Sequence, residues 1–364
     1  MMYYSASMNT LDESLTNAVK EGELLESSLT NIRLLLAGTK SPIACEAVEE
    51  LAAAGEWQEL NDRFYKTLAF GTGGLRGRTI GSIVTRAEQG NGGVNGRPEY
   101  PCVGTACMNY FNVGRAMRGL IIYVKKHVEA TDPGRKPRLV IGHDTRHFSR
   151  DFAEFCAKIG TDLGCDIYLF DSPRATPEVS FAIRELNADS GVVLTASHNP
   201  SHDNGFKAYF NDGAQLVPPH DKAVIEEVNS LTSEEYEPLP EDRRGTLHVL
   251  DASFDRVYMD RLKTVLLRPE LFSKGGAKIV YSNLHGTGGH IIVPLLKELG
   301  CNVQTVAAQD ASRRGPPPTR KTRRPWPWPL SRRTLPARTS SSPRTRTRTA
   351  WVWPFAGKMG KCTC

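Results

Sequence analysis

The run Thr195-Ala196-Ser197-His198-Asn199-Pro200, followed at once by Asp203-Asn204-Gly205-Phe206-Lys207, says most about how this chain folds. Residues 191–194 in front of it (G-V-V-L) predict a buried strand, and Asn199-Pro200 predicts a turn directly after that strand. A serine at the end of a strand is held rigidly and is exposed, which is where a nucleophile has to stand. An ordinary turn serine is the alternative interpretation, because serine is a common turn residue.

The length and order of these residues resemble the active-site serine loop of the α-D-phosphohexomutases, the phosphoglucomutase/phosphomannomutase superfamily. The resemblance implies α/β/α domains whose mixed sheets are covered by helices, with domain I and part of domain II in this chain. It also implies that Ser197 carries a phosphoryl group, gives it to a sugar phosphate and takes another back. A serine hydrolase is disfavoured, because no G-x-S-x-G elbow surrounds Ser197 and the neighbouring lysine and arginines favour an anion.

A second motif, Phe70–Gly77 with the sequence F-G-T-G-G-L-R-G, resembles the N-terminal motif of the same superfamily, whose arginine faces the phosphoserine. Glycines let backbone N–H groups approach an anion closely, and a guanidinium fork can clamp phosphate oxygens. The resemblance therefore assigns Arg76 to the phosphoryl group and Thr72, Gly73 and Gly74 to substrate binding. Without the serine loop, this segment would be read as a simple glycine-rich turn.

The resemblance assigns roles to the residues around the serine as well. Lys207 is the candidate general acid and base for the sugar hydroxyl, with a cation that merely balances phosphate as the alternative. His198 hydrogen bonds the phosphoserine or only shapes the loop, and Asn199 is a candidate for substrate binding. Ser197 is in addition a metal ligand through its phosphate.

Two further segments are predicted to be helix starts without a direct part in the chemistry. In the pattern D-x-R-x-x-S, Ser149 is predicted to cap a helix while Asp144 pairs with Arg146. In Thr176–Glu178, Pro177 is predicted to occupy the first helical position.

The apolar pattern predicts helices and strands in alternation, which indicates βαβ units and a sheet covered on both faces. Strands are predicted at 139–141, 166–170, 191–194, 278–281 and 302–306, and helices at 151–163, 177–186, 218–231, 254–267 and 288–299. Four regions follow from this: a helical N-terminal region at 1–68, domain I at 69–232, the start of domain II at 245–310, and a basic Arg/Pro/Trp tail at 311–364.

Length and composition favour a cytoplasmic protein. With 364 residues, the chain is long enough for two domains or three small ones. Residues 1–18 lack a basic start followed by an apolar run, and no segment is long and apolar enough to cross a bilayer, so no membrane contact is expected. The scattered cysteines form no C-x-x-C pair and fit free thiols in a reducing compartment: Cys45, Cys102, Cys107, Cys156, Cys165, Cys301, Cys362 and Cys364.

Residues 311–364 differ in composition from everything before them. They hold eleven arginines, three lysines and no acidic residue, so the tail carries +14 and the preceding 310 residues carry −8 of a formal net charge of +6. Such a tail predicts disorder, or nucleic-acid binding through charge. The superfamily instead has a metal-binding loop of three alternating aspartates here. Because a one-base shift can turn Arg-Thr codons into D-P-D-A-D, we interpret this tail as a frameshifted translation of that loop.

The resemblance predicts a phosphosugar mutase, an isomerase that interconverts hexose 1-phosphate and 6-phosphate through a phosphoserine. It implies Mg²⁺ as the metal, beside the three aspartates that this chain lacks, and glucose 1,6-bisphosphate as activator and intermediate. Glucose phosphate is the first choice of substrate, before mannose phosphate and a pentose phosphate.

Two alternatives to an active mutase remain open. Because the later domains are missing, we expect the 364-residue chain to be incomplete and unable to turn over. One alternative is a catalytically silent remnant that binds phosphosugars. The other is a nucleic-acid-binding protein that acts through the tail, and without a genuine tail no nucleic-acid partner is expected. The sequence does not predict an oligomeric state.

Overall fold

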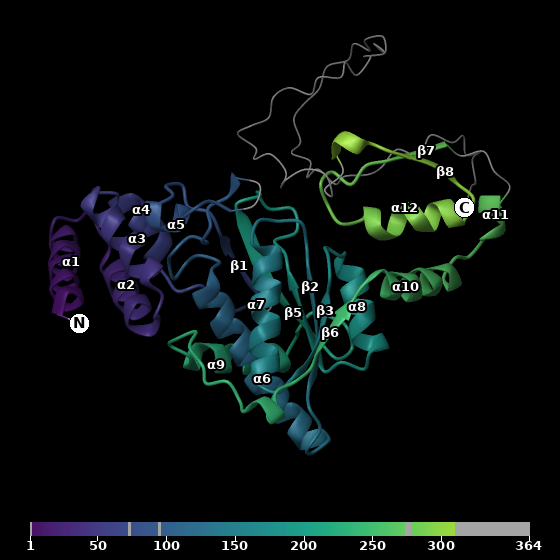
Figure 1. Ribbon diagram of the computed structural model, residues 1–364, viewed down its shortest axis with the longest axis horizontal. Coiled ribbons are helices and arrows are strands. Elements are labelled where there is room, and N and C mark those ends of the chain that lie inside the picture. The colour runs from purple at the N-terminus through teal and green to yellow at the C-terminus, as the bar shows by residue number, and fades with distance from the viewer. Residues whose placement is uncertain (1, 72–73, 94–95, 274–277, 310–364) are drawn as a thin grey trace, which may run out of the picture. The chain divides into compact units, whose positions relative to one another are not determined.

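The computed structural model describes residues 2–71, 74–93, 96–273 and 278–309 (Figure 1). Four helices lie in the region predicted to be helical: α1 (Met2–Lys20), α2 (Glu26–Gly38), α3 (Pro42–Ala53) and α4 (Trp57–Phe64). Pro42 opens α3, where its missing N–H removes no helical hydrogen bond. The apolar faces of these helices share one core, whose buried members include Leu15, Ile32, Leu35, Val48, Leu60 and Phe64.

A six-stranded sheet with the strand order β1-β5-β4-β2-β3-β6 carries the candidate site. The strands are β1 (Leu75–Arg78), β2 (Arg138–His143), β3 (Asp166–Phe170), β4 (Ser190–Leu194), β5 (Asp203–Phe210) and β6 (Leu247–Leu250). β4, β2, β3 and β6 are parallel, whereas β5 is antiparallel to both β4 and β1. The predicted α/β class with a mixed sheet is therefore confirmed.

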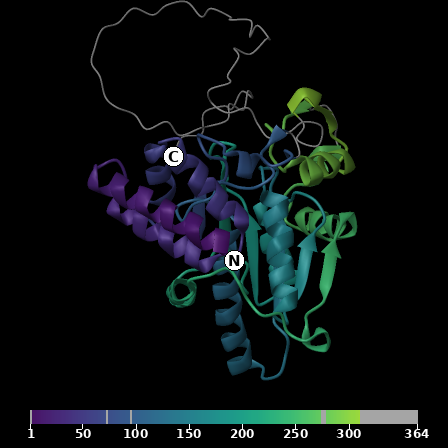
Figure 2. The ribbon, with the colours of Figure 1, turned by 60° about the vertical axis from the view of Figure 1, so that its left-hand side comes forward.

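Helices cover both faces of this sheet, as Figures 1 and 2 show. On one face lie α6 (Tyr110–Thr131), α7 (Ser149–Asp162) and α9 (His220–Ser230), and on the other lie α8 (Thr176–Glu185) and the start of α10 (Ala252–Thr264). Alternate residues of β2 face the two sides: Leu139 and Ile141 pack on the α7 side and Val140 on the α8 side. This is the period of two that a strand buried on both faces requires.

A separate pair of parallel strands follows along the chain. β7 (Lys278–Tyr281) and β8 (Asn302–Thr305) are joined through α12 (Gly289–Glu298), so these residues form a βαβ unit. The shorter elements are the helices α5 (Arg86–Gln89) and α11 (Glu270–Ser273) and the 3₁₀ turns Glu241–Arg243 and Ala307–Gln309. The division of the chain into domains I and II remains a prediction, and the basic tail lies outside the described residues.

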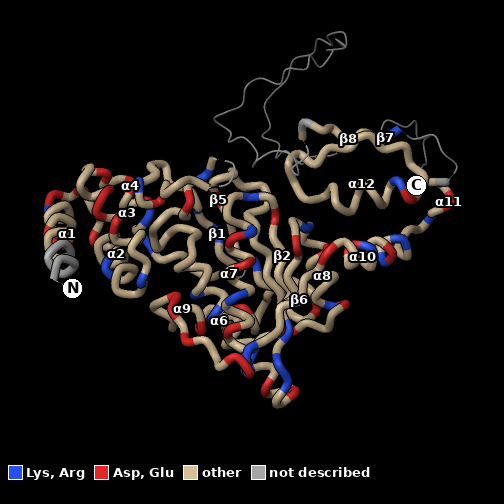
Figure 3. Tube along the Cα trace, viewed as in Figure 1, with Lys and Arg blue, Asp and Glu red and all other residues tan. Residues whose placement is uncertain are grey.

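Charged residues of both signs are spread over the described part of the chain. Figure 3 shows acidic and basic residues interspersed along the elements, for example on α10, where Arg256 pairs with Asp260. In the described part of the chain, no helix has both the length and the apolar character that a bilayer crossing demands. The cysteines that the structure describes form no disulfide, in line with the predicted thiols.

Three local predictions need correction. Ser149 is not the cap of α7 but its first residue, because Phe148 adopts a left-handed φ of 62° and takes the cap position. Pro177 is the second residue of α8 rather than the first, since the helix begins at Thr176. Leu247–Leu250, predicted to belong to the second domain, pairs with β3 and extends the sheet of the first.

Six of the described helices and strands were not predicted from the sequence: α5, α6, α11, β1, β5 and β6. β1 and β5 overlap the two quoted motifs, whose glycines favour turns, as Asn204-Gly205 does in β5. The start of α6 does carry a readable signal, because the side chain of Asn109 accepts a hydrogen bond from the Asn112 N–H at 3.1 Å, as an N-cap does.

Candidate active site

The candidate site lies where β2 and β4 end. Asp144 directly follows β2, and Thr195 directly follows the neighbouring parallel strand β4. The chain leaves β2 through α7 toward β3 on one side, whereas it leaves β4 toward β5 on the other side. Connections that diverge from two neighbouring strands leave a crevice at the carboxyl ends of these strands, which is where open α/β sheets bind ligands.

Ser197 stands in a strained, exposed turn after β4. Its φ is 59°, in the left-handed region that residues other than glycine seldom adopt. Ala196 before it is fully buried, and the Asn199 N–H donates to the Ala196 carbonyl at 3.1 Å, which closes the turn. Such strain persists only where surrounding contacts impose it, so the contacts of this loop are informative.

Arg146 supplies most of these contacts. Its Nη2 donates to the carbonyl oxygens of Ser197 and Asn199 at 2.7 and 2.6 Å, and its Nη1 donates to that of Pro200 at 2.6 Å. The predicted ion pair with Asp144 is also present, with Arg146 Nε 3.2 Å from Asp144 Oδ2. The ion pair was therefore predicted from the sequence, whereas the larger role of Arg146, which is to hold the serine loop, was not.

Asp144 orients both Arg146 and Thr195, which contact the backbone of the serine loop. Its Oδ1 accepts from the Arg146 N–H at 2.9 Å and from the Ser149 hydroxyl at 2.6 Å, and its Oδ2 accepts from the Thr195 hydroxyl at 2.5 Å. The Thr195 hydroxyl oxygen in turn accepts from the Ser197 N–H at 2.9 Å. A chain of hydrogen bonds thus runs from the end of β2 to the backbone of Ser197.

Ser197 opens on a cavity of about 240 Å³ that is rich in cations. Arg146, Arg174 and Lys207 line it, together with a single acidic residue, Asp144, whose carboxylate is already paired with Arg146. Residues 284–287 line it as well, and the Thr145 hydroxyl donates to the carbonyl of His285 at 2.7 Å. Arg146 is paired with Asp144, and Arg174 with Asp255. The positive charge left for an anionic ligand such as a phosphate is therefore that of Lys207, with Arg76 nearby.

Lys207 is half-buried on β5, opposite Val193 of β4. Burial lowers the pKa of Lys207, and the nearby positive charge of Arg76 lowers it further. A lysine that holds its proton less tightly is better suited to general acid–base work than an ordinary surface lysine. This direction is consistent with the predicted role of Lys207.

The other predicted site residues are distributed unevenly around the cavity. Arg76 lies on β1, exposed, and close enough to influence Lys207. His198 and Asn199 are not among the described residues that line the cavity, and the Asn199 amide instead donates to Asp203 across the loop at 3.2 Å. Their predicted contacts with phosphate or substrate remain predictions.

The glycine-rich motif is described only in part. Thr72 and Gly73 lie outside the described residues. Gly74 has a φ of 82°, and a Cβ atom on it would come within 1.9 Å of the Phe206 carbonyl oxygen of β5. Gly74 is therefore required by the fold, whatever part it has in binding.

The described residues do not by themselves fit the predicted Mg²⁺. They contain no group of three or more His, Cys, Asp or Glu side chains arranged around a metal position. A hard divalent cation needs several oxygen ligands, and the Asp144 carboxylate is committed to Arg146, Ser149 and Thr195. The three aspartates that the prediction requires are absent from the sequence.

Comparison with known proteins identifies the fold around this cavity. Residues 86–235 match the family described as phosphoglucomutase/phosphomannomutase, alpha/beta/alpha domain I. The chain belongs to the phosphoglucomutase/phosphomannomutase superfamily. The resemblance inferred from the serine loop is therefore confirmed, and the matched segment contains both Ser197 and Lys207. Arg76 precedes it.

This chain spans only part of the length of the relatives that it matches. A Staphylococcus epidermidis protein named phosphoglucomutase is 31% identical over 253 residues, which are 69% of this chain and 41% of that protein. A Homo sapiens protein named phosphopentomutase is 29% identical over 271 residues, which are 71% of this chain and 40% of that protein. A solved phosphoglucomutase/phosphomannomutase family protein from Burkholderia thailandensis is similar over 67% of this chain and 44% of its own, with 20% identity and a TM-score of 0.43.

Proposed function

We propose that this chain carries the phosphoserine part of a phosphosugar mutase, in which Ser197 accepts and returns a phosphoryl group. The observation that supports this most is the position of Ser197 itself. It is exposed in a left-handed turn that Arg146 holds, at the mouth of a cavity lined by Lys207 and Arg174. A rigid, exposed nucleophile beside fixed cations is what phosphoryl transfer requires, because positioning and electrostatics supply most of its catalysis.

In the proposed step, the Ser197 hydroxyl oxygen attacks a phosphorus atom of a sugar bisphosphate. The Oγ–P bond forms while the P–O bond to the sugar breaks, and the serine proton ends on the freed sugar oxygen. Lys207 mediates this proton movement, and Arg76 balances the charge on the phosphoryl oxygens. The phosphoryl group on Ser197 then passes to the free hydroxyl of the isomeric monophosphate and regenerates the bisphosphate, so that the net result is conversion of one monophosphate into the other. Mg²⁺ stays a prediction, because the described residues offer no set of oxygen ligands for it.

We propose a hexose phosphate as the substrate, with glucose phosphate preferred to mannose phosphate and a pentose phosphate as the third choice. Support comes from the relatives named phosphoglucomutase, and the relative named phosphopentomutase keeps a pentose among the candidates. Glucose 1,6-bisphosphate is accordingly the proposed phosphoryl donor, and a cytoplasmic location fits a sugar phosphate substrate.

The proposal is tested by phosphorylating the full chain with ³²P-labelled glucose 1,6-bisphosphate, with and without Mg²⁺. We expect label on Ser197 in the wild-type chain and none in Ser197→Ala. Ser230→Ala, which removes an exposed serine on α9, should keep the label. A wild-type chain that stays unlabelled while the bisphosphate protects it against unfolding would be a silent phosphosugar-binding protein, and the proposal would be wrong.

The role of Lys207 is tested in the same assay. Lys207→Gln keeps a polar side chain but removes the amine that can gain or lose a proton, and we expect the rate of labelling to fall by about 10²–10⁴-fold. Lys222→Gln, at an exposed position on α9, is the matched control and should label at the wild-type rate. Equal rates for both variants would reduce Lys207 to a cation that the reaction does not need.

A further inference from the structure

A buried cluster of one arginine and two carboxyl groups lies on the α8 side of the sheet. Arg174, just before α8, is 3% exposed, Glu178 in the first turn of α8 is 0% exposed, and Asp255 on α10 is 6% exposed. The neighbouring core residues Phe170, Phe181 and Phe254 exclude water around them. Arg174 supplies only one positive charge for two buried carboxyl groups, so a second negative charge here would be uncompensated and costly.

All N–H groups of Arg174 are committed to other acceptors. Nε and Nη2 bind the two carboxylate oxygens of Asp255 at 2.7 and 3.0 Å, a bidentate arrangement. Nη1 donates to the Ser172 hydroxyl at 2.5 Å and to the Pro173 carbonyl at 3.3 Å, and Nη2 also reaches Asp171 at 3.3 Å. A guanidinium has five N–H donors, so none is left for Glu178.

Glu178 accepts no hydrogen bond from the residues that the structure describes. Its Oε1 is 4.0 Å from Arg174 Nε. An ionised, fully buried carboxylate without donors is strongly disfavoured, whereas a protonated one can donate to Asp255, which lies within hydrogen-bonding reach.

The remaining charged and titratable groups around Glu178 do not stabilise its ionised form. Asp171 binds Arg174 from the end of β3 and adds a negative charge, although its side chain is 41% exposed. Tyr258 faces Glu178 from α10 and is neutral at ordinary pH, because burial and the charge of Glu178 raise the pKa of Tyr258. Arg184, farther along α8, is exposed and influences Tyr258.

We propose that Glu178 carries a proton at neutral pH and donates it in a hydrogen bond to Asp255, so that this carboxyl pair is a pH-sensitive support for Arg174 in the wall of the Ser197 cavity. Asp255 then carries the one negative charge that Arg174 neutralises, and Glu178 is a positioning residue that acts through them. Loss of the proton at alkaline pH places a second, unpaired negative charge in the core and loosens the contact between α8 and α10.

The direction of the pKa shift agrees with the geometry. Burial raises the pKa of Glu178 to about 8 from an ordinary value of 4.5, and the hydrogen bond to Asp255 and the charge of Asp255 act in the same direction. The folded state therefore binds this proton more tightly than the unfolded state does. Its contribution to stability is fully present below pH 4.5 and is lost as the pH rises through about 8.

The test compares unfolding of the wild-type full chain and of Glu178→Gln, a neutral isostere, by urea titration from pH 4.5 to pH 8.5. The unfolding equilibrium constant of the wild type, relative to that of the variant, should rise by about tenfold per pH unit until about pH 8. Glu185→Gln, on the exposed side of the same helix, should show a constant ratio. A constant or falling ratio for Glu178→Gln would overturn the proposal.

A second measurement keeps the test decisive if Glu178→Gln does not fold. The side-chain carboxyl ¹³C resonance of Glu178 in the wild-type chain should titrate well above pH 6, and a midpoint below pH 5 would contradict the proposal. In Asp255→Asn, Arg174 is left with Glu178 as its partner, so the midpoint should fall by at least one pH unit. Both readouts use the chain without any sugar phosphate, so they do not depend on phosphoryl transfer at Ser197.

Discussion

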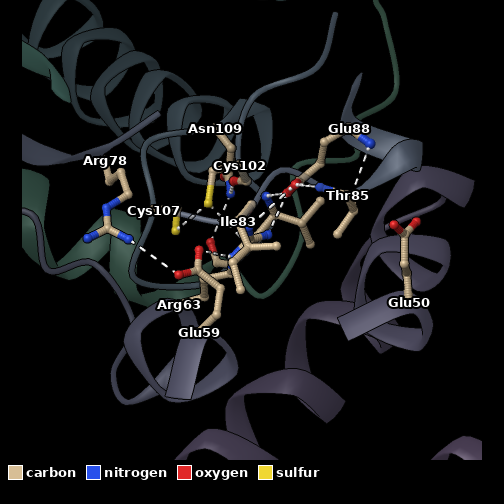
Figure 4. Close-up of polar contacts among 12 residues, drawn as sticks. Glu50, Glu59, Arg63, Arg78, Ile83, Thr85, Glu88, Cys102, Cys107 and Asn109 are labelled. Carbon is tan, nitrogen blue, oxygen red and sulfur yellow. Dashed lines mark hydrogen bonds and ion pairs between the residues drawn. The ribbon is translucent and has the colours of Figure 1, made fainter. Parts of the chain in front are cut away.

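Two buried arginines of this chain show how differently one cation can be combined with two carboxyl groups. Arg63 of α4 is 1% exposed and lies between Glu59 and Glu88, as Figure 4 shows. Arg174 is 3% exposed and lies with Asp255 and Glu178. Each cluster combines one arginine with two acidic residues, yet the hydrogen bonds of the two clusters differ.

Three of the four carboxylate oxygens of the Arg63 cluster accept hydrogen bonds, and the fourth, Glu59 Oε2, lies in an ion pair with Arg78. Glu59 Oε1 accepts from Arg63 Nε at 2.9 Å and from the Ser82 N–H at 3.1 Å, while Glu59 Oε2 is 3.7 Å from Arg78. The Glu88 oxygens accept from Arg63, from the Val103 N–H at 2.7 Å and from the Thr85 N–H at 3.0 Å. Backbone N–H groups and a second arginine, Arg78, thus contact the carboxylate oxygens of Glu59 and Glu88. Glu178 has no such contacts among the described residues. The number of donors, rather than the number of carboxyl groups, decides whether a buried acid can stay charged.

The largest effect should come from removing the cation of the fully satisfied cluster. Arg63→Met leaves two buried carboxylates without their counter-charge, and we expect the free energy of unfolding to fall by about 3–5 kcal/mol. Urea unfolding at pH 7 measures this. Arg86→Met is the control, because Arg86 is 93% exposed in its pair with Glu50 and should cost less than about 1 kcal/mol. Similar losses in both variants would remove the distinction between buried and exposed pairs.

Arg174→Met should cost less than Arg63→Met. Only Asp255 is then left as a buried charge, because Glu178 is already neutral, and we expect a loss of about 2–3 kcal/mol at pH 7. The same urea titration measures it, with Arg63→Met as the reference. A loss as large as that of Arg63→Met would mean that both carboxyl groups of the Arg174 cluster are charged, which contradicts the comparison.

Neutralising one acid in each cluster should give effects of opposite sign. Glu59→Gln removes a charge that Arg63 and Arg78 both contact, so a loss of about 1–3 kcal/mol is expected at pH 7. Glu178→Gln should instead stabilise the chain at that pH, because the neutral glutamine removes the need for this side chain to take up a proton on folding. Unfolding curves of the two variants recorded side by side decide this, and losses in both would break the comparison.

The smallest effect should come from the capping box that includes Glu88. Thr85 and Glu88 form a capping box at the start of α5, in which each side chain accepts a hydrogen bond from the backbone N–H of the other. Thr85→Val keeps the shape of the side chain but removes the hydroxyl, and should lower the free energy of unfolding by about 1 kcal/mol. Thermal unfolding would reveal it as a small drop in Tm, and an unchanged Tm would show that the box adds nothing to the cluster.

The sequence predicts local features of this chain better than long-range ones. The order of residues in Thr195–Lys207 was sufficient to identify the serine loop and the superfamily, and the strands at β2, β3 and β4 were predicted from their apolar runs. The 22-residue helix α6 was missed because its amphipathic pattern carries no motif, although Asn109 marks its start.

The contacts that build the site could not be predicted, because they join residues far apart in sequence. Arg174 and Asp255 are 81 positions apart, and Thr195 and Asp144 are 51 positions apart. The clamp of Arg146 on the serine loop depends on β2 and β4 being neighbours, which only the strand order reveals. The starts of α7, α8, α9, α10 and α12 were predicted to within two residues. At α7, Phe148 in a left-handed conformation replaces Ser149 as the cap.

Whether Ser197 carries a phosphoryl group is measured by mass spectrometry of the full chain after incubation with glucose 1,6-bisphosphate. We expect one added phosphoryl group per chain, found on the peptide that contains Ser197 and removed again by an excess of glucose 1-phosphate. A chain that gains no phosphoryl group, or that gains one on a residue other than Ser197, would contradict this expectation.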